Sequence, residues 1–348
     1  MNATVHGISP WRGRAAAGSA AAAMFLMGTL APVSDLIKDY PVYGGMAVRY
    51  TMGAAVLVAV CAAMRLRFVR LTPREIVLLA ALTLVGLVLF NVGVVEATRH
   101  GGATLAGTVL GAVPLVLALV GGGRPTPRLL AGAGVVVVGT TVATGLGTGG
   151  PTALMWALFA LGCETGFSLL AIPLLPKLGA VRTSAYVSAL AVPMLLAMGW
   201  VADGPAMLRA PDRGELLGLA YLGVIVTAAA FLLWYFALPR LGPGRAGLFA
   251  GVVPISAILT VTVLGGGPPS VGEAVGALMV VGGILIGLSA PQTATGTTRS
   301  KSPSKSSTRS KGIEVGLSQG MANAAGAQSA PAVEVSRVNA PATGGRGL

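Results

Sequence analysis

Charged residues are scarce in this 348-residue chain: Asp, Glu, Lys and Arg together make up 10% of it, against about 25% in an ordinary soluble domain. A soluble fold of this length could not cover its surface with so few charges. Hydrophobic residues make up 54% of the chain, and the mean hydropathy is +0.80. Lipid is the solvent that matches this composition, so the sequence predicts an integral membrane protein.

Residues that bind metals or take part in redox or hydrolytic reactions are also few. The two cysteines, Cys61 and Cys163, lie in apolar stretches without a CxxC pattern, so no haem, redox or zinc motif is present. The two histidines, His6 and His100, are far apart, whereas a lipid-modifying membrane enzyme would need His, Asp or Glu clustered at one membrane face. No G-x-x-x-x-G-K-[ST] phosphate loop is found, which argues against ATP-driven transport. We expect no metal, no cofactor and no catalysis.

Acidic residues are outnumbered, 11 against 24 basic ones, which gives a net charge of +13. The basic residues lie in short connectors between apolar runs and in the C-terminal tail, and no basic stripe is interleaved with aromatics. This distribution argues against nucleic-acid binding. In a membrane protein such charges orient helices and contact anionic lipid headgroups.

Ten apolar runs have the length of roughly 20 residues that a helix needs to cross the hydrocarbon core. We therefore expect an all-α membrane protein with about ten transmembrane helices. The rival count of nine treats residues 1–30 as a cleaved signal peptide, but the apolar stretch continues beyond the usual length of such a segment. The runs cover residues 15–37, 43–64, 75–97, 101–120, 128–147, 152–172, 183–200, 215–238, 244–264 and 271–290.

The positive-inside rule gives the orientation. With a cytoplasmic N-terminus, inside segments hold twelve basic residues and outside segments hold five, while the remaining seven lie in the tail, which is also inside if the number of spans is even. Both termini are therefore predicted to be cytoplasmic. A bias for Arg over Lys and abundant Ala and Gly suggest a bacterial source, hence the bacterial plasma (inner) membrane.

An internal repeat is the most informative pattern. Residues 106–114 and 246–254 both fit A-G-x-x-x-G-x-V-P, 140 positions apart, and Glu75 matches Glu215 at the same offset. Further along the offset becomes 144, where Gly132 matches Gly276 and Gly139 matches Gly283. The sequence thus predicts two five-helix units, residues 15–147 and 152–290. A cytoplasmic segment, 1–14, precedes them, and a disordered basic cytoplasmic tail, 291–348, follows.

The repeat has a mechanical consequence. After five spans the second unit enters the membrane from the opposite side, so the halves are predicted to be inverted repeats, which supply the two conformations that alternating access needs. Within the repeated motif, small residues let helices approach closely, and a proline can kink the helix. Static packing and a hinge or cavity-lining role are both open for these residues, namely Gly107, Gly111, Pro114, Gly247, Gly251 and Pro254.

The pattern resembles the drug/metabolite transporter superfamily, specifically its EamA-type ten-helix members. The duplicated unit, the glycine-rich last helix of each unit, Arg49 early in the second span and the stretch 234–238 carry the resemblance, which covers residues 15 to about 290. It implies a cavity between the halves that opens to one side at a time, and export or exchange of small metabolites.

Ionisable and polar residues inside spans are costly and therefore functional candidates. Glu164 lies at mid-depth in the sixth span, where desolvation favours the neutral acid. Loss of its proton when a cation or amine enters would couple exchange to protons, as a membrane-embedded Glu does in the related small multidrug resistance family. The alternative is a neutral Glu that is hydrogen-bonded to a neighbouring helix.

The other candidates have equally open interpretations. Arg49 lies within snorkelling reach of the outer headgroups, or anchors an anionic substrate group, or pairs with a carboxylate such as Asp35 or Glu96. Asp35 could simply cap the first helix. Asn91, deep in the third span, could line the cavity or join two helices. Four aromatics near predicted interfaces suggest an aromatic belt, namely Trp156, Trp200, Trp234 and Tyr235.

The function predicted from the sequence is a secondary transporter for a small metabolite, an amino acid-like compound or a drug. Its expected partners are the solute and membrane lipids, with the proton as a candidate coupling ion and a homodimer left open. Two alternatives remain: a non-transporting membrane scaffold or partner subunit, and a lipid-modifying enzyme.

Overall fold

The computed structural model describes residues 10–67, 69–122, 125–146 and 149–289, and the regular structure within these ranges is entirely helical. The predicted tail, 291–348, and the first nine residues lie outside the described ranges. The elements of the first half are α1 (Pro10–Gly28), α2 (Leu30–Asp35), α3 (Val42–Ala63), α4 (Pro73–Thr83), η1 (Leu84–Leu89), α5 (Phe90–Leu110), α6 (Val113–Val120) and α7 (Pro127–Thr144). Those of the second half are α8 (Pro151–Ala171), α9 (Leu175–Asp203), η2 (Gly204–Met207), α10 (Arg213–Tyr221), η3 (Leu222–Ala229), α11 (Ala230–Leu241), α12 (Pro243–Leu248), η4 (Phe249–Gly251), α13 (Val252–Val261), η5 (Thr262–Gly266) and α14 (Val271–Leu288).

Within the described residues, nine helical segments are long and apolar enough to cross a membrane, and a shorter apolar helix covers Leu105–Val120. Each of these ten segments overlaps one of the ten runs expected from hydropathy. The expectation of an all-helical membrane protein with about ten spans is confirmed. The first of these segments is part of the bundle, because α1 packs against α11 and α13.

Local sequence explains where several helices begin. Thr72 and Glu75 form a capping box at the start of α4, and Asp212 and Glu215 form one at the start of α10. In each box the N-cap side chain accepts a hydrogen bond from the N3 amide, and the N3 carboxylate accepts one from the N-cap amide. The two boxes lie 140 positions apart, at the offset of the internal repeat. Ser270, at the start of α14, makes the same arrangement with Glu273.

The helices are also interrupted at matching positions. The chain has a positive φ of 76° at both Gly102 and Gly242, a conformation that suits glycine because it has no Cβ. A π-helical segment interrupts the third span at η1 and the eighth at η3. The fourth span breaks at residues 111–112, just before α6, and the ninth is 3₁₀-helical at η4, just before α13.

The six predicted packing or hinge residues lie around these last breaks. Pro114 and Pro254 occupy the first turns of α6 and α13. A Cβ on Gly247 or Gly251 would lie 2.9 Å from Leu117 Cβ and 2.5 Å from Val136 Cγ1, respectively, so both positions need glycine for close packing. Gly111 is similar, because its Cβ would lie 2.6 Å from Thr140 Cγ2. Gly107 differs from the prediction: a Cβ there would meet nothing within 4 Å, so it makes no close helix contact. A hinge role for the set stays a prediction.

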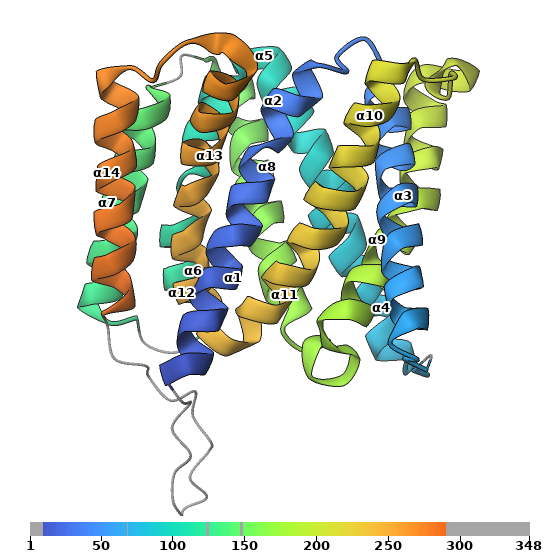
Figure 1. The fold of residues 1–348 in the computed structure, drawn as a ribbon, viewed down its shortest axis with the longest axis horizontal. Coiled ribbons are helices and arrows are strands. Elements are labelled where there is room, and N and C mark those ends of the chain that lie inside the picture. Colours follow the sequence, from blue (N-terminus) through green and yellow to red (C-terminus); the bar gives the residue numbers. More distant parts are fainter. Residues whose placement is uncertain (1–9, 68, 123–124, 147–148, 290–348) are drawn as a thin grey trace, which may run out of the picture. The chain divides into compact units, whose positions relative to one another are not determined.

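Helix packing follows one pattern in both halves. α1 packs on α11, and α8 packs on α5; α1 also packs on α13, as α8 does on α6. Three further contacts pair a span with its own counterpart: the second with the seventh through α3 and α9, the fourth with the ninth through α6 and α12, and the fifth with the tenth through α7 and α14. Exchanging the two halves therefore leaves this set of contacts unchanged. Figure 1 shows that α4 and α10, which correspond in the repeat, start at opposite ends of the helices.

The helices have one strongly basic end. At this end, where α3 stops and α4 and α9 begin, Lys177 Nζ lies 2.5 Å from Glu75 Oε2, and Arg182 Nε donates to Arg67 O at 3.0 Å. The start of α1 and the end of α14 lie at this same end (Figure 1). We call it the basic end and the other the latch end. Basic side chains in the connectors and helix ends here include Arg65, Arg67, Arg70, Arg74, Lys177, Arg182, Arg240 and Arg245.

Candidate functional site

Arg49 is buried in the interior, with 5% of the residue exposed. From α3 its Nε donates to Thr227 Oγ1 on η3 at 2.7 Å, and Thr227 Oγ1 in turn donates to Leu222 O at 2.9 Å. This differs from two expectations, because Arg49 does not extend to the headgroups and pairs with neither Asp35 nor Glu96. The sequence could not show it, since the partner is a hydroxyl in an apolar run 178 residues away.

Close backbone approach makes this contact possible. A Cβ on Gly223 would lie 2.8 Å from Arg49 O, and one on Gly53 would lie 2.9 Å from Gly223 O and from Thr227 Cγ2. Two glycines therefore let α3 and η3 touch without intervening side chains. The π-helical register of η3 turns Thr227 relative to an ordinary helix, because it adds a residue to the turn.

Four buried aromatic rings from three helices surround the same region: Tyr50 of α3, Phe167 of α8, and Phe231 and Tyr235 of α11. Phe167 lies 5.6 Å from both Phe231 and Tyr235, and Tyr50 lies 6.4 Å from Phe231, measured between ring centroids. The Arg49 guanidinium carbon is 5.2 Å from the Tyr50 centroid, within the range of a cation–π contact. We call Tyr50, Phe167, Phe231 and Tyr235 the aromatic cluster.

Two more predicted residues reach this cluster. The Asn91 side chain lies beside Tyr50, and its Nδ2 donates to Leu87 O in the preceding turn of the same span. Glu164 is close enough to Tyr50 and Tyr235 to interact with both electrostatically. Arg49, Asn91 and Glu164 are thus brought together around one set of rings.

Two polar groups here lack a partner among the described residues. The half-buried Glu164 carboxylate makes no hydrogen bond or ion pair within those ranges, so the alternative of a glutamate bonded to a neighbouring helix does not describe this conformation. The Tyr235 hydroxyl, on a residue that is 1% exposed, is likewise unpaired within the part of the chain that is described. Buried polar atoms are normally satisfied, and exceptions are typical of places that receive a ligand, a water or an ion.

Asp35 and Glu96 lie outside the cluster. Glu96 Oε1 is 2.8 Å from Arg99 Nη1, and Glu96 Oε2 is 3.7 Å from His100 Nε2, both one turn along the same helix. Asp35 is exposed at the end of α2. Neither carboxylate meets Arg49, so the two are separate from the site.

Sequence reasoning missed the aromatic side of the site. Trp234 and Tyr235 were expected in a belt at the membrane interface, but they are 4% and 1% exposed and belong to the interior. Trp200, at 61% exposure, fits a belt position. One feature of the sequence could have pointed to Tyr50, because it directly follows a charged residue inside a span. Nothing in the sequence distinguishes Thr227 from the other threonines.

A hollow of about 440 Å³ approaches the site from the basic end. It lies between the start of α9 and the end of α11, and Tyr235 is one of its walls. The remaining wall residues are Leu175, Pro176, Gly179, Ala180, Phe236, Pro239 and Arg240. Within the described ranges no three His, Cys, Asp or Glu side chains gather in a group that could hold a metal ion.

Comparisons with known proteins agree with this architecture. Residues 151–288 match the EamA-like transporter family. The uncharacterized transporter YetK of Bacillus subtilis (strain 168) is 24% identical over 280 residues, which is 77% of this chain and 85% of YetK. A solved structure titled only "Crystal structure of protein", 24% identical, superposes with a TM-score of 0.67 over 78% of this chain and 96% of its own, which shows a shared fold. These comparisons support the resemblance of the chain to EamA-type transporters of the drug/metabolite transporter superfamily.

Proposed function

We propose that this membrane transporter is a secondary carrier that exports or exchanges a small metabolite, an amino acid-like compound or a drug by alternating access. The observation that carries the proposal is the meeting of Arg49 and Asn91, from the first half, with Glu164, Thr227 and Tyr235, from the second. A site shared by two halves is altered when the halves move against each other. The proposed setting is the bacterial plasma membrane, with the basic end and both termini in the cytoplasm.

The inverted relationship of the halves is part of this proposal. It is supported by the capping boxes, by the glycine turns at residues 102 and 242, and by the packing pattern that survives exchange of the halves. Near-equivalent halves that run in opposite directions can adopt two related arrangements with the site open to opposite faces.

The chemistry of the site supports a small solute with both apolar and polar groups. Four rings supply apolar and cation–π contact, the Arg49 guanidinium suits an anionic group, and the Glu164 carboxylate suits an amine or a proton. Within the described ranges Arg49 donates a hydrogen bond only through Nε, which leaves its terminal nitrogens available for a solute. In this proposal, Glu164 loses its proton when a cationic group enters, and this couples the two fluxes.

The test is counterflow in proteoliposomes, with a panel of labelled amino acids and amines, over a range of pH. We expect saturable flux that depends on pH, and we expect Glu164→Gln to abolish that dependence. Glu96→Gln is the matched control, because Glu96 lies within a transmembrane segment but outside the aromatic cluster. A normal pH profile in Glu164→Gln would refute proton coupling through this residue. Absence of saturable flux for every solute, together with unchanged efflux on deletion of the gene, would favour a scaffold.

A further inference from the structure

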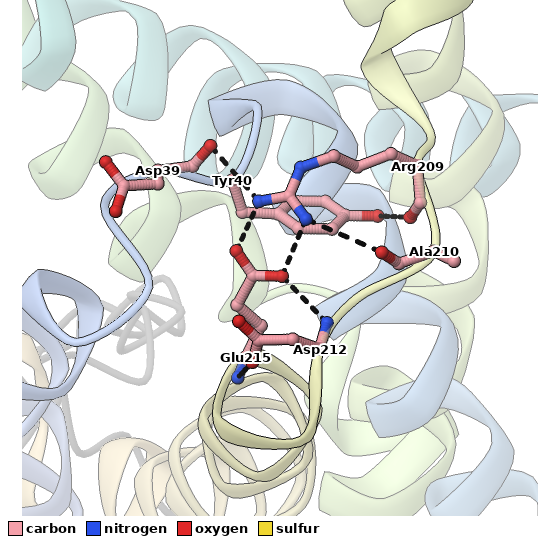
Figure 2. Close-up of polar contacts among 6 residues, drawn as sticks. All are labelled: Asp39, Tyr40, Arg209, Ala210, Asp212 and Glu215. Atoms are coloured by element: carbon pink, nitrogen blue, oxygen red, sulfur yellow. Dashed lines mark hydrogen bonds and ion pairs between the residues drawn. The ribbon is translucent and has the colours of Figure 1, made fainter.

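Two connectors from different halves of the chain meet at the latch end. The first follows α2 and contains Asp39 and Tyr40; the second follows η2 and contains Arg209, and leads into Glu215 in the first turn of α10. Figure 2 shows the Arg209 guanidinium lying over the Tyr40 ring, with the Glu215 carboxylate beside it. We call Tyr40, Arg209 and Glu215 the latch.

Arg209 uses most of its hydrogen-bonding capacity in these contacts. Its two terminal nitrogens donate to both oxygens of the Glu215 carboxylate, Nη1 to Oε2 at 2.8 Å, which is the paired geometry that makes arginine–carboxylate contacts strong. Nη2 also donates to Asp39 O at 3.3 Å. The hydrogen bond to Glu215 raises the pKa of Arg209 above its usual value, so the latch keeps its charge at physiological pH.

Tyr40 completes the connection between the halves. Its hydroxyl donates to Arg209 O at 2.7 Å, and its ring centroid lies 4.9 Å from the Arg209 guanidinium carbon. Tyr40 is 4% exposed and the Glu215 side chain is 7% exposed, although Arg209 itself is 42% exposed. In the latch, the partly exposed Arg209 therefore covers the buried Tyr40 and Glu215 side chains.

The latch lies at the end of α3 that is nearer to the candidate site, because Tyr40 immediately precedes the start of this helix and Arg49 lies in its third turn. Arg49 follows Tyr40 by nine residues, which is about 13 Å along a helix. A second contact between the halves lies below the latch, because Tyr221 Oη is 3.0 Å from Thr29 Oγ1. At the basic end, in contrast, the hollow reaches Tyr235 of the aromatic cluster.

We propose that the latch is the gate that closes the latch end of the solute pathway, and that it must separate before the candidate site can face that side. This inference rests on the proposed function, since a gate has meaning only in a carrier with two faces. Separation breaks the contacts of Arg209 with Tyr40 and Asp39, which join the halves. The Arg209–Glu215 pair stays within the second half and fixes the guanidinium in place over the ring.

The test measures thiol accessibility in a Cys61→Ala/Cys163→Ala background. Thr29→Cys, at a residue that is 6% exposed, reports on the latch end, and Ala180→Cys reports on the hollow at the basic end. The probe is a membrane-impermeant methanethiosulfonate, applied from each side of the membrane to intact cells and inverted vesicles. We expect Arg209→Gln to raise the labelling rate of Thr29→Cys by roughly five- to thirtyfold. Tyr40→Phe, which removes only the hydroxyl, should give a smaller rise in the same direction.

Arg99→Gln is the matched control, because Arg99 pairs with Glu96 inside one helix, at 2.8 Å, and among the described residues this pair joins no two elements. It should leave both reporters unchanged. A higher labelling rate at Thr29→Cys without a rise at Ala180→Cys supports the gate. Unchanged labelling at Thr29→Cys, or a simultaneous rise at both reporters, which indicates general loosening, overturns it. Thiol labelling needs no solute. A failure of transport in proteoliposomes would therefore count against the proposed function, and the labelling rates could still be interpreted.

Discussion

Gly139→Ala places a single methyl group where the backbones of α7 and α14 touch. A Cβ at Gly139 would lie 2.8 Å from Val280 N and 2.9 Å from Gly276 O, and one at Gly276 would lie 2.5 Å from Gly139 O. These separations are about 0.5–0.9 Å short of the 3.4 Å at which ordinary contact begins. The obstructing atoms belong to backbone, which cannot rotate away as a side chain can, so the helices themselves must move apart.

The expected cost follows from this overlap. Inserting a methyl group into a well-packed interface destabilises by roughly 1–3 kcal/mol, and a gap of 0.5–1 Å already forfeits about a quarter to a half of each contact's attraction. Each kcal/mol lowers the melting temperature of a protein of this size by about 2–4 °C. We therefore expect Gly139→Ala to lower the apparent melting temperature in detergent by several degrees, measured by loss of the monodisperse peak after heating.

Gly134→Ala is the matched control on the same helix. A Cβ at Gly134 would meet nothing within 4 Å, and replacing glycine by alanine in a helix otherwise stabilises it by about 0.5–1 kcal/mol. The control should therefore melt at or above the wild-type temperature. If Gly139→Ala melted no lower than Gly134→Ala, the close approach of α7 and α14 would be wrong.

Three further predictions concern the site and the helix ends. Thr227→Val leaves the buried Arg49 guanidinium without its partner and should lower the melting temperature, whereas Thr227→Ser, which keeps the hydroxyl, should restore it. Arg49→Lys keeps the charge but loses the planar fork, so we expect kcat/KM for counterflow to fall by about ten- to hundredfold; unchanged kinetics would exclude Arg49 from solute binding. Thr72→Ala removes the N-cap of α4 and should cost about 1 kcal/mol in thermal unfolding assays, with Thr72→Ser as the conservative control.

The spans were predictable because one physical requirement dominates them. Backbone polar groups must be satisfied inside each lipid-embedded segment, so helix length follows directly from the length of the apolar run. The expected run at 128–147, for example, became α7 at Pro127–Thr144. Even the short fourth helix lay within the predicted run at 101–120.

The site was only half predictable. Arg49, Asn91 and Glu164 could be found because polar residues in hydrocarbon are rare, and the fold brings all three together. Their neighbours could not be found, because aromatic residues in spans are common and only tertiary packing separates the buried Tyr235 from the exposed Trp200. The Arg49–Thr227 bond depends on the π-helical turn of η3 and on two glycines in contact, neither of which hydropathy reveals.

The backbone pattern is repeated in the two halves, whereas the polar residues of the site are not, and this difference bears on mechanism. At the offset of 140, Arg49 corresponds to Ala189, and Asn91 corresponds to Phe231 of the aromatic cluster. The backbone breaks recur in both halves, as Gly102 and Gly242 do, but the polar side chains of the site do not. Two equivalent scaffolds can exchange conformations at little cost in energy, whereas one asymmetric set of side chains binds a solute in one orientation. In the proposed carrier, the duplication thus accounts for the movement, and the divergence between the two copies accounts for recognition.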